Sequence, residues 1–289
     1  MNYPKISIVT PNYNQATFLE QTILSVLNQG YPNLEYIIID GGSTDGSVEI
    51  IRKYETQLAY WISEHDGGMY EAIQKGFDKS SGEIMAWINS DDMYHPKALF
   101  TVADIFHHIK EVNWLVGADT GYDEMGRTTR IAQSRAFTKF DFWAHDYCWI
   151  QQESCFWRRS LWEKVGGSLN TQLHFAGDFD LWLRFFRFEQ LYVVNALIGG
   201  FRGRRSNQLS LDHLDEYLAE AEEQLKNEPL SETNKRVLKK YERIKFIHNK
   251  LKPYKIINAD RIIKRFRRIY FPSVKTIEFD RDTQHYYLK

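Results

Sequence analysis

The sequence contains little cysteine and no long hydrophobic run. Cys148 and Cys155 are the only cysteines among 289 residues, and their spacing matches neither a disulfide framework nor a paired set of metal ligands. No run of about 18 apolar residues occurs, and the chain enters a strand pattern at once, without the apolar region of a secretory signal. We therefore expect reduced thiols in a cytoplasmic protein that is neither secreted through a cleaved signal nor embedded in a membrane.

A strong overall charge is absent as well. The formal net charge is −1, so the molecule as a whole shows no preference for a charged partner. Residues 231–275 nevertheless hold fifteen Lys or Arg and only three acidic residues, a local charge of +12 that leaves −13 for the remainder. Because no recognised nucleic-acid-binding module accompanies this basic segment, we expect no nucleic acid partner.

A buried strand that ends in acidic residues is the most informative feature present. The five apolar residues at 84–88 lie between Ser-Gly-Glu and Asn-Ser-Asp-Asp, which is the length and flanking pattern of a strand inside a parallel sheet. Ligands of open α/β sheets bind beyond the carboxyl ends of the strands. Asp91 and Asp92 at such an end therefore indicate a divalent cation that holds phosphate.

Strand and helix patterns alternate along the first hundred residues. We expect strands at 6–10, 34–39, 59–63 and 84–88, separated by helices that start near Thr17 in a capping box with Glu20, run from Asp45 or Ser47 to Lys53, and span 69–80. This alternation predicts a parallel, doubly wound α/β sheet. Further helices are expected at 96–110, 160–165, 178–188 and 211–226, and strands at 114–116 and 191–196, whereas the pattern weakens between 118 and 155.

Six motifs follow one another along residues 4–210. They are ISIVTPNYN at 6–14, IIIDGGSTDGS at 37–47, SEHDGGMYEAIQKG at 63–76, WINSDD at 87–92, FWRRSLWEKVGG at 156–167 and FAGDFDLWLR at 175–184. In their order and spacing they resemble the family 2 glycosyltransferases with the GT-A fold. The resemblance implies a Rossmann-like, mainly parallel sheet flanked by helices in a catalytic domain at 1–210, followed by a helical, basic C-terminal extension at 211–289.

The same resemblance implies an activity. It is that of an inverting, metal-dependent glycosyltransferase, which moves a sugar from a nucleotide diphosphate sugar, expected to be a UDP-sugar, to an acceptor hydroxyl. A glycan or a lipid-linked acceptor in bacterial-type polysaccharide or glycolipid synthesis is the expected partner.

Nucleotide contacts are implied near the ends of the first strands. The residues concerned are Thr10, Pro11, Tyr13, Asp40, Asp66, Lys75 and Asp91. Alternatives remain from the residues themselves: Tyr13 can be a packed tyrosine of a strand-ending turn, Asp40 a turn-forming aspartate, and Lys75 a solvated helix lysine.

The chemistry is expected at two acids. By resemblance Asp92 holds Mg²⁺ or Mn²⁺, which neutralises the diphosphate as the anomeric bond breaks. Asp178 matches the general base, the carboxylate that takes the acceptor proton on the face opposite the leaving group. Gly177 lies just before it, where relatives often carry Glu. Residues 201–210 resemble a segment that often supplies a histidine to the metal; since none occurs here, Arg204 or Arg205 is expected to meet the diphosphate.

The basic segment allows two interpretations. Helices expected at 234–250 and 256–268 carry Lys and Arg on one side and Ile, Leu and Phe on the other. They can lie on an anionic membrane surface, which suits a lipid-linked acceptor and a peripheral location on the cytoplasmic membrane face. Equally, they can pack on the catalytic domain and leave a solvated charged face.

Two other functions share part of the pattern. A sugar-phosphate nucleotidyltransferase uses the same nucleotide and cation, but it needs a basic glycine-rich loop after the first strand, and residues 10–15 contain none. A non-catalytic nucleotide-sugar binding protein is expected to lack one of the key acids, whereas both Asp92 and Asp178 are present.

Overall fold

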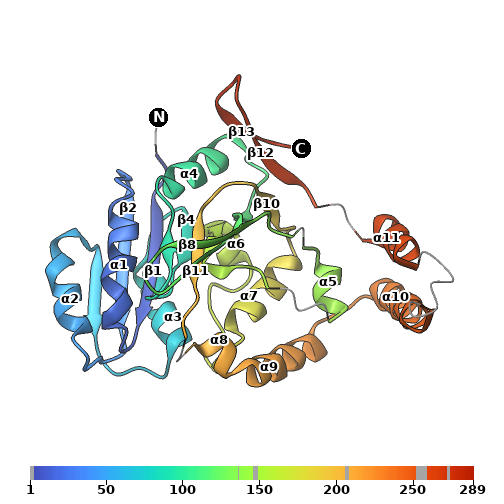
Figure 1. The fold of residues 1–289 in the computed structure, drawn as a ribbon, viewed down its shortest axis with the longest axis horizontal. Helices are drawn as coiled ribbons and strands as arrows, with labels where there is room; N and C mark the ends of the chain where they lie inside the picture. Colours follow the sequence, from blue (N-terminus) through green and yellow to red (C-terminus); the bar gives the residue numbers. More distant parts are fainter. Residues whose placement is uncertain (1–2, 136, 146–148, 206–207, 252–258, 272–273) are drawn as a thin grey trace.

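The computed structural model describes residues 3–135, 137–145, 149–205, 208–251, 259–271 and 274–289, so Cys148 lies outside the described residues. Within these ranges the chain forms a large mixed sheet that is covered by helices on both faces (Figure 1). Its strands are β1 (Ile6–Asn12), β2 (Leu34–Asp40), β3 (Tyr60–Ser63), β4 (Ile84–Trp87), β6 (Trp114–Val116), β9 (Cys155–Arg158), β10 (Tyr192–Val194), β12 (Thr276–Asp280) and β13 (His285–Leu288). Their order across the sheet is β13-β12-β10-β6-β9-β4-β1-β2-β3.

The four strands β1 to β4 lie next to one another in this sheet and run parallel, as the alternating pattern predicted. Successive residues of a strand point to opposite faces, so Ile6 and Ile8 belong to one core cluster and Val9 belongs to the other. The cluster around Ile6 is covered by α1 (Ala16–Leu27), α2 (Ser47–Tyr54) and α4 (Ala98–His108), and the cluster around Val9 by α3 (Met69–Lys79), α6 (Arg159–Lys164) and α7 (Gly177–Phe186). The predicted α/β sheet with helices on both faces is confirmed.

The region between residues 118 and 155 holds structure that the sequence did not predict. It contains β7 (Asp119–Tyr122), β8 (Thr128–Ala132), α5 (Lys139–Trp143) and the 3-10 turn η2 (Gln152–Ser154). The following strand, β9, runs antiparallel between β4 and β6. A smaller sheet in the order β5-β11-β7-β8 includes β5 (Met93–Tyr94), which begins directly after Asp92, and β11 (Gly199–Arg202). This smaller sheet places β11 beside the chain that leaves β4.

The start of α1 differs from the prediction. The helix begins at Ala16 with Gln15 as its N-cap residue, so Thr17 and Glu20 do not form the expected capping box. The backbone N–H of Ala16 instead donates to Asp45 Oδ2 at 2.8 Å, and Asp45 Oδ1 accepts the N–H of Ser47 at the start of α2. The 3-10 turn η1 (Glu55–Gln57) follows α2. One carboxylate thus holds the starts of two helices.

The C-terminal segment contains the expected helices and a hairpin that was not expected. The helices are α8 (Leu209–Asp212), α9 (Leu214–Asn227), α10 (Glu232–Leu251) and α11 (Ala259–Tyr270). After them β12 pairs parallel with β10, and β13 returns antiparallel to β12. Residues 276–288 therefore differ from the expected helical extension; their two short strands around Gln284, whose φ is 59°, are typical of a hairpin. The domain division after residue 210 stays a prediction, although β12 joins the main sheet.

Candidate functional site

Asp91 and Asp92 lie just beyond the carboxyl end of β4, as the sequence predicted. Asp92 is 1% exposed, and its Oδ1 accepts a hydrogen bond from the backbone N–H of Arg202 at 2.8 Å. Burial, together with the negative charges of Asp91 and Glu153, raises the pKa of Asp92 well above its ordinary value. Burial also raises the pKa of Asp91, against the opposing charge of Arg204. Added positive charge is therefore favourable at this cluster.

Glu153 belongs to the same cluster and was not predicted as a site residue. It lies in η2, is buried, and its Oε1 has no hydrogen-bond partner among the described residues. Burial, followed by the charges of Asp119 and Asp91, raises the pKa of Glu153 to about 8. The only sequence signal was its position just before the apolar residues 155–157, inside the region of weak pattern, so its role became visible only in the fold.

Arginines at the end of β11 offset part of this negative charge. Arg202 is fully buried, and its Nε donates to the backbone carbonyl of Asp91. The Nε of Arg204 lies 3.1 Å from Asp91 Oδ2. Arg205 is different, because its side chain is 93% exposed and its ion pair is with Glu124 at 4.0 Å. Of the two arginines expected at a diphosphate, Arg204 reaches the acidic cluster and Arg205 does not, whereas the sequence analysis missed Arg202.

The residues predicted at the end of β1 differ in their exposure. Thr10 is buried, and its hydroxyl lies 3.1 Å from the hydroxyl of Tyr36 inside the core. Pro11 is also buried, whereas Tyr13 is 64% exposed. Of these three residues, only Tyr13 has a side chain open to a ligand at the surface, whereas Thr10 is fully enclosed by the fold.

Asp40, at the end of β2, holds the loop that follows it. Its two carboxylate oxygens accept hydrogen bonds from Asn12 Nδ2 at 2.6 Å, Ser63 Oγ at 2.6 Å and the backbone N–H of Ser43 at 2.9 Å. Burial acts to raise the pKa of Asp40, but these hydrogen bonds outweigh it and lower the pKa overall. A direct contact between Asp40 and a base or ribose stays a prediction. In such a contact the ligand would donate to carboxylate oxygens that already accept hydrogen bonds within the protein.

Asp66 and Lys75 border the same end of the sheet. The carboxylate of Asp66 lies against Gly41, where a Cβ would come within 3.1 Å of its Oδ2, and burial raises the pKa of Asp66. Lys75 Nζ lies 3.1 Å from Glu71 and 3.2 Å from Glu64. The structure therefore brings Asp66 to the loop after β2, while Lys75 is paired with two acidic side chains at the surface.

Asp178 lies in the first turn of α7 beside a small pocket. Its Oδ1 accepts the backbone N–H of Phe179 at 2.7 Å, and the Tyr217 hydroxyl lies 3.5 Å from the same oxygen. The other residues that line the pocket are Phe142, Trp149, Ile150 and Trp182. Burial raises the pKa of Asp178 to about 6, although hydrogen bonds oppose the shift. Such a carboxylate is ionised at neutral pH and basic enough to accept a proton from a bound hydroxyl.

Residues beyond 210 hold the loop that precedes Asp178. α9 runs beside α7 along the lower edge of the molecule in Figure 1. The carboxylate of Glu220 on α9 accepts hydrogen bonds from the three consecutive backbone N–H groups of residues 174–176, at 2.8–2.9 Å. A negative charge next to a helix N-terminus is stabilised by the helix dipole. The polar sequence of α9 gave no sign of this role or of the contact made by Tyr217.

Gly177 is explained by packing. A Cβ at this position would lie 2.7 Å from the ring of Tyr70, and the Tyr70 hydroxyl donates to the backbone carbonyl of Phe175 at 2.7 Å. The tyrosine therefore occupies the space that a glutamate side chain would need, and it supports the turn just before Asp178.

The acids of the two motifs, far apart in the sequence, are carried by segments that contact one another. Cys155 is fully buried at the start of β9. Burial, and then the charges of Glu153 and Asp178, raise the pKa of its thiol. Contacts join the two parts: Gln152, the residue before Glu153, donates to the backbone carbonyl of Trp87 at the end of β4 at 2.7 Å, and the ring of Trp87 stacks at 5.9 Å on Trp182, one turn after Asp178 in α7. Asp92, Glu153 and Asp178 therefore belong to one region of the molecule.

The carboxylates at the end of β4 suit a hard divalent cation. Mg²⁺ and Mn²⁺ prefer oxygen ligands, and the buried Oε1 of Glu153 has no donor among the described residues. A cation held by Asp92, with Asp91 and Glu153 nearby, offsets the repulsion that raises the pKa of Asp92. The chemistry of these donors thus fits the cation that the sequence predicted.

Comparisons of sequence agree with this reading. The family model described as glycosyl transferase family 2 matches residues 7–166. An uncharacterized glycosyltransferase of Rickettsia typhi is 26% identical over 230 residues, which cover 75% of this chain and 70% of the relative. An uncharacterized glycosyltransferase of Mycobacterium tuberculosis is 31% identical over 166 residues, which cover 57% of this chain and 62% of the relative.

Solved structures share the fold. The structure of S. aureus TarS 1–349 in complex with UDP-GlcNAc matches with a TM-score of 0.63 and 17% identity, covering 89% of this chain and 77% of that chain. Against a longer TarS chain the match spans 44% of its length. A mannosyltransferase from Pyrobaculum calidifontis, in complex with GDP-Man and Mn²⁺, matches with a TM-score of 0.60 and 14% identity, covering 94% of this chain and 82% of that chain.

Proposed function

This chain belongs to glycosyl transferase family 2, and we propose that it is an inverting transferase that moves a sugar from a nucleotide diphosphate sugar to an acceptor hydroxyl. The observation that supports this most strongly is the pairing of two differently built acidic sites in one region: a crowded carboxylate cluster at Asp92 and a single carboxylate, Asp178, beside an aromatic pocket. A UDP-sugar is the first candidate for the donor, because the TarS structure with the same fold holds UDP-GlcNAc.

The donor diphosphate is proposed to lie at the acidic cluster. When bound there, Mg²⁺ or Mn²⁺ supplies charge neutralisation to the departing diphosphate. Asp92 and Glu153 offer buried oxygens to the cation, and Arg204 is placed beside Asp91 to add a second positive charge. Arg202 fixes the geometry, because its backbone N–H holds Asp92 and its side chain holds the backbone of Asp91.

The acceptor is proposed to enter at the pocket beside Asp178. Trp149 and Tyr217 lie edge to face at 4.9 Å in the wall of this pocket, and aromatic rings offer flat apolar surfaces to the C–H faces of a sugar. Asp178 takes the proton of the acceptor hydroxyl as the oxygen of that hydroxyl bonds to the anomeric carbon. The diphosphate leaves on the opposite side, so the anomeric configuration inverts.

A panel of nucleotide sugars tests the donor assignment. UDP-, GDP-, dTDP- and CMP-sugars are added to the full chain with and without Mn²⁺, and the unfolding midpoint is recorded. A ligand that binds the native state raises the midpoint, so we expect a UDP-sugar to do so only when the cation is present. Protection by a GDP-sugar alone would change the proposed donor from a uridine nucleotide to a guanosine nucleotide. Protection by none of these sugars would contradict the proposal.

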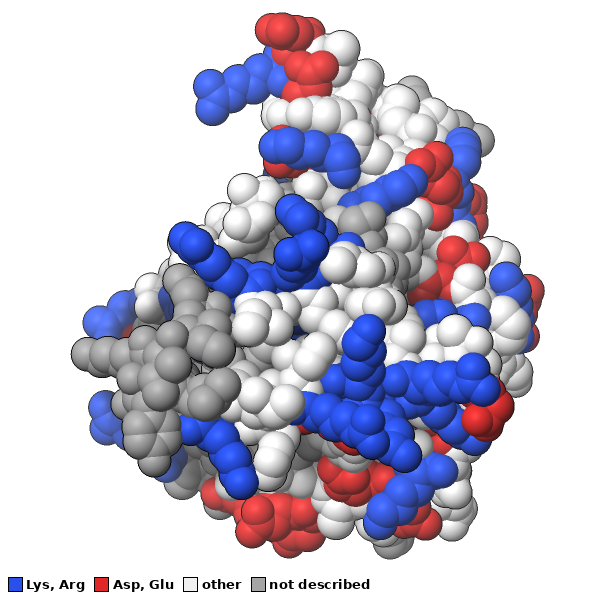
Figure 2. Space-filling view, turned by 90° about the vertical axis from the view of Figure 1, so that its right-hand side faces the viewer, with Lys and Arg blue, Asp and Glu red and all other residues white. Residues whose placement is uncertain are grey.

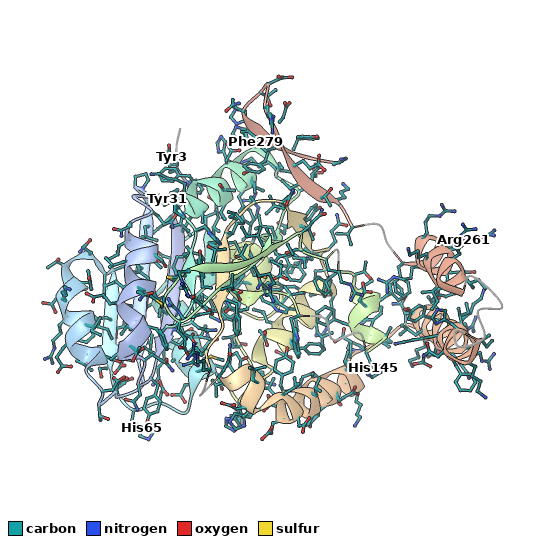
Figure 3. The ribbon with its side chains drawn as sticks, viewed as in Figure 1. Tyr3, Tyr31, His65, His145, Arg261 and Phe279 are labelled. Carbon is teal, nitrogen blue, oxygen red and sulfur yellow. The ribbon has the colours of Figure 1, made fainter. Side chains whose placement is uncertain are left out.

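The C-terminal helices support a lipid-linked acceptor at an anionic membrane surface. They pack on the body through one side, where Phe271 stacks on Phe140 at 4.9 Å and Arg267 pairs with Asp141. The same helices also expose apolar residues among Lys and Arg, namely Phe246, Ile247, Ile262 and Ile269. Figure 2, which faces the right-hand side of Figure 1, shows Lys and Arg gathered on that face, and Arg261 points outward from α11 in Figure 3. Residues 252–258 and 272–273 of the basic segment lie outside the described residues.

The helices pack on the body as one interpretation expected, and we propose that their exposed residues bind a membrane surface as the other expected. Among the described residues, no helix has the length and the apolar character needed to cross a bilayer. Exposed apolar side chains surrounded by basic ones instead suit binding at the membrane surface. Sedimentation with vesicles checks this. We expect the chain to bind anionic vesicles but not neutral ones, and the substitution Phe246→Ser to reduce this binding. Equal sedimentation with both vesicle types would contradict it.

A further inference from the structure

We infer that Asp104, His108 and His285 form a second metal site, which takes a cation that favours nitrogen ligands, such as Zn²⁺. Asp104 and His108 lie one turn apart on α4, and His285 begins β13. Asp104 Oδ1 is 3.1 Å from His108 Nδ1 and 3.2 Å from His285 Nδ1. One ligand atom from each of the three residues lies within 4.8 Å of the others. This site is additional to the proposed transferase chemistry and does not depend on it.

The spacing of these atoms suits tetrahedral zinc. With zinc–ligand bonds of about 2.0–2.1 Å, neighbouring ligand atoms of a tetrahedron are about 3.3 Å apart. The two distances from Asp104 Oδ1 are close to this value, and the remaining pair, one nitrogen from each histidine, lies within 4.8 Å. Two imidazoles and one carboxylate leave a fourth position for water, and this donor set differs from the all-carboxylate cluster at Asp92. The two sites are thus expected to prefer different cations.

Neighbouring contacts hold the three side chains in place. The backbone N–H of Tyr286 donates to Asp104 Oδ2 at 3.3 Å, which leaves Oδ1 facing the histidines. The rings of His108 and His285 are 4.1 Å apart. At this separation a single ion can lie within reach of a nitrogen from each ring. Partners that orient metal ligands in this way are usual at metal sites.

The site joins the end of the chain to the body of the fold. Asp104 and His285 are 181 positions apart, and the hairpin of β12 and β13 lies above α4, with Phe279 labelled on it (Figures 1 and 3). α4 packs in the core cluster around Ile6, whereas α7 packs in the cluster around Val9 on the other face of the sheet. A cation here would therefore stabilise the folded hairpin on the face of the sheet opposite to α7, which carries Asp178.

Zinc binding by the full chain tests the inference, with excess Mg²⁺ present to occupy the acidic cluster. We expect calorimetry and elemental analysis to find one tightly bound Zn²⁺ per chain, and added zinc to raise the unfolding midpoint by roughly 3–6 °C. His285→Gln and, separately, His108→Gln are expected to lose both effects. His65→Gln is the matched control, because His65 is an exposed histidine far from the hairpin in Figure 3.

Three outcomes would overturn the inference. The first is a parent chain that binds no zinc under these conditions. The second is equal zinc stoichiometry in the parent and in whichever of the two histidine variants is folded by circular dichroism. The third is equal loss in His65→Gln. Exposed ion pairs contribute little by themselves, so a cluster that serves only as ion pairs predicts no thermal response to zinc. None of these results bears on the transferase proposal, which the nucleotide-sugar panel tests separately.

Discussion

Asp92 and Asp178, the two acidic residues proposed for the chemistry, both have raised pKa values but lie in different surroundings. Burial raises the pKa of both Asp92 and Asp178. At Asp92 the nearby charges of Asp91 and Glu153 add to this effect, whereas at Asp178 hydrogen bonds, first of all from the backbone N–H of Phe179, oppose it. The wall beside Asp178 is aromatic, while the cluster at Asp92 is bordered by Arg202.

This difference separates the roles of the two sites. Crowded carboxylates are stabilised by an added cation, so the end at Asp92 is suited to a metal and a diphosphate. A single carboxylate among apolar side chains holds its proton more tightly than usual but is still ionised at neutral pH, which suits a general base. Environment, rather than residue type, distinguishes the two aspartates.

The largest effect is expected from Asp178→Asn, which removes the base and leaves the shape. Transfer should fall about 10³-fold, within the range that general base catalysis contributes. Donor binding, read as the thermal shift with nucleotide sugar, should stay as in the parent chain. Because burial disfavours the charged form of Asp178, the variant is also expected to unfold no earlier. A variant that transfers sugar at the parental rate would show that another group takes the proton.

Asp92→Asn is expected to impair the metal-binding part of the site. It removes one negative charge from the cluster, so the cation should bind more weakly and transfer should fall about 10²-fold. Unlike Asp178→Asn, this change should also weaken cation-dependent binding of the donor. Chelation of the cation in the parent chain should reproduce the loss, and renewed addition of Mn²⁺ should reverse it. Donor binding that is unaffected both by the substitution and by chelation would argue against a metal at this position.

Glu220→Gln is expected to disturb the surroundings of Asp178 and to leave the carboxylate cluster at Asp92 unchanged. In the parent chain three backbone N–H groups donate to the two carboxylate oxygens of Glu220. The glutamine side chain of the variant offers them only one acceptor oxygen. We expect a loss of about 1–3 kcal/mol in the free energy of unfolding, a drop of roughly tenfold in kcat, and little change in KM for the donor. Glu223→Gln, an exposed glutamate on the same helix, is the control and should behave like the parent. Equal behaviour of the two variants would remove α9 from the site.

The elements of the first hundred residues were predictable because their signals are local. A period of two along β1 and apolar flanks around β4 are properties of short segments, and the acids that follow β4 are adjacent in the sequence. Residues 276–288 were assigned wrongly to a helical extension because the basic composition before them dominated the interpretation. Their pairing depends on β10, which is more than eighty residues earlier.

The missed site residues act through distant contacts. Arg202 reaches Asp92 across 110 positions, and Glu220 reaches the loop before α7 across 44 to 46 positions. Neither contact leaves a periodic pattern in the sequence. Glu153 is a single acid in a region of weak pattern, so only its burial reveals it. The nucleotide contacts expected at Thr10 and Asp40 stay predictions, and the hydrogen bonds of both side chains within the fold show that a residue at a strand end can also have a structural role.

The smallest expected effect concerns the pH dependence of the base. Since the pKa of Asp178 is raised to about 6, kcat/KM for the acceptor should be constant above this pH and fall roughly tenfold per unit below it, as the carboxylate is protonated. The Tyr217 hydroxyl lowers the pKa of Asp178, so Tyr217→Phe should move this limb to higher pH. At a separation of 3.5 Å the shift should stay below about one unit, with rates near pH 8 almost unchanged. A limb that moves to lower pH, or a tenfold loss at pH 8, would mean that Tyr217 acts on the acceptor and not on the aspartate.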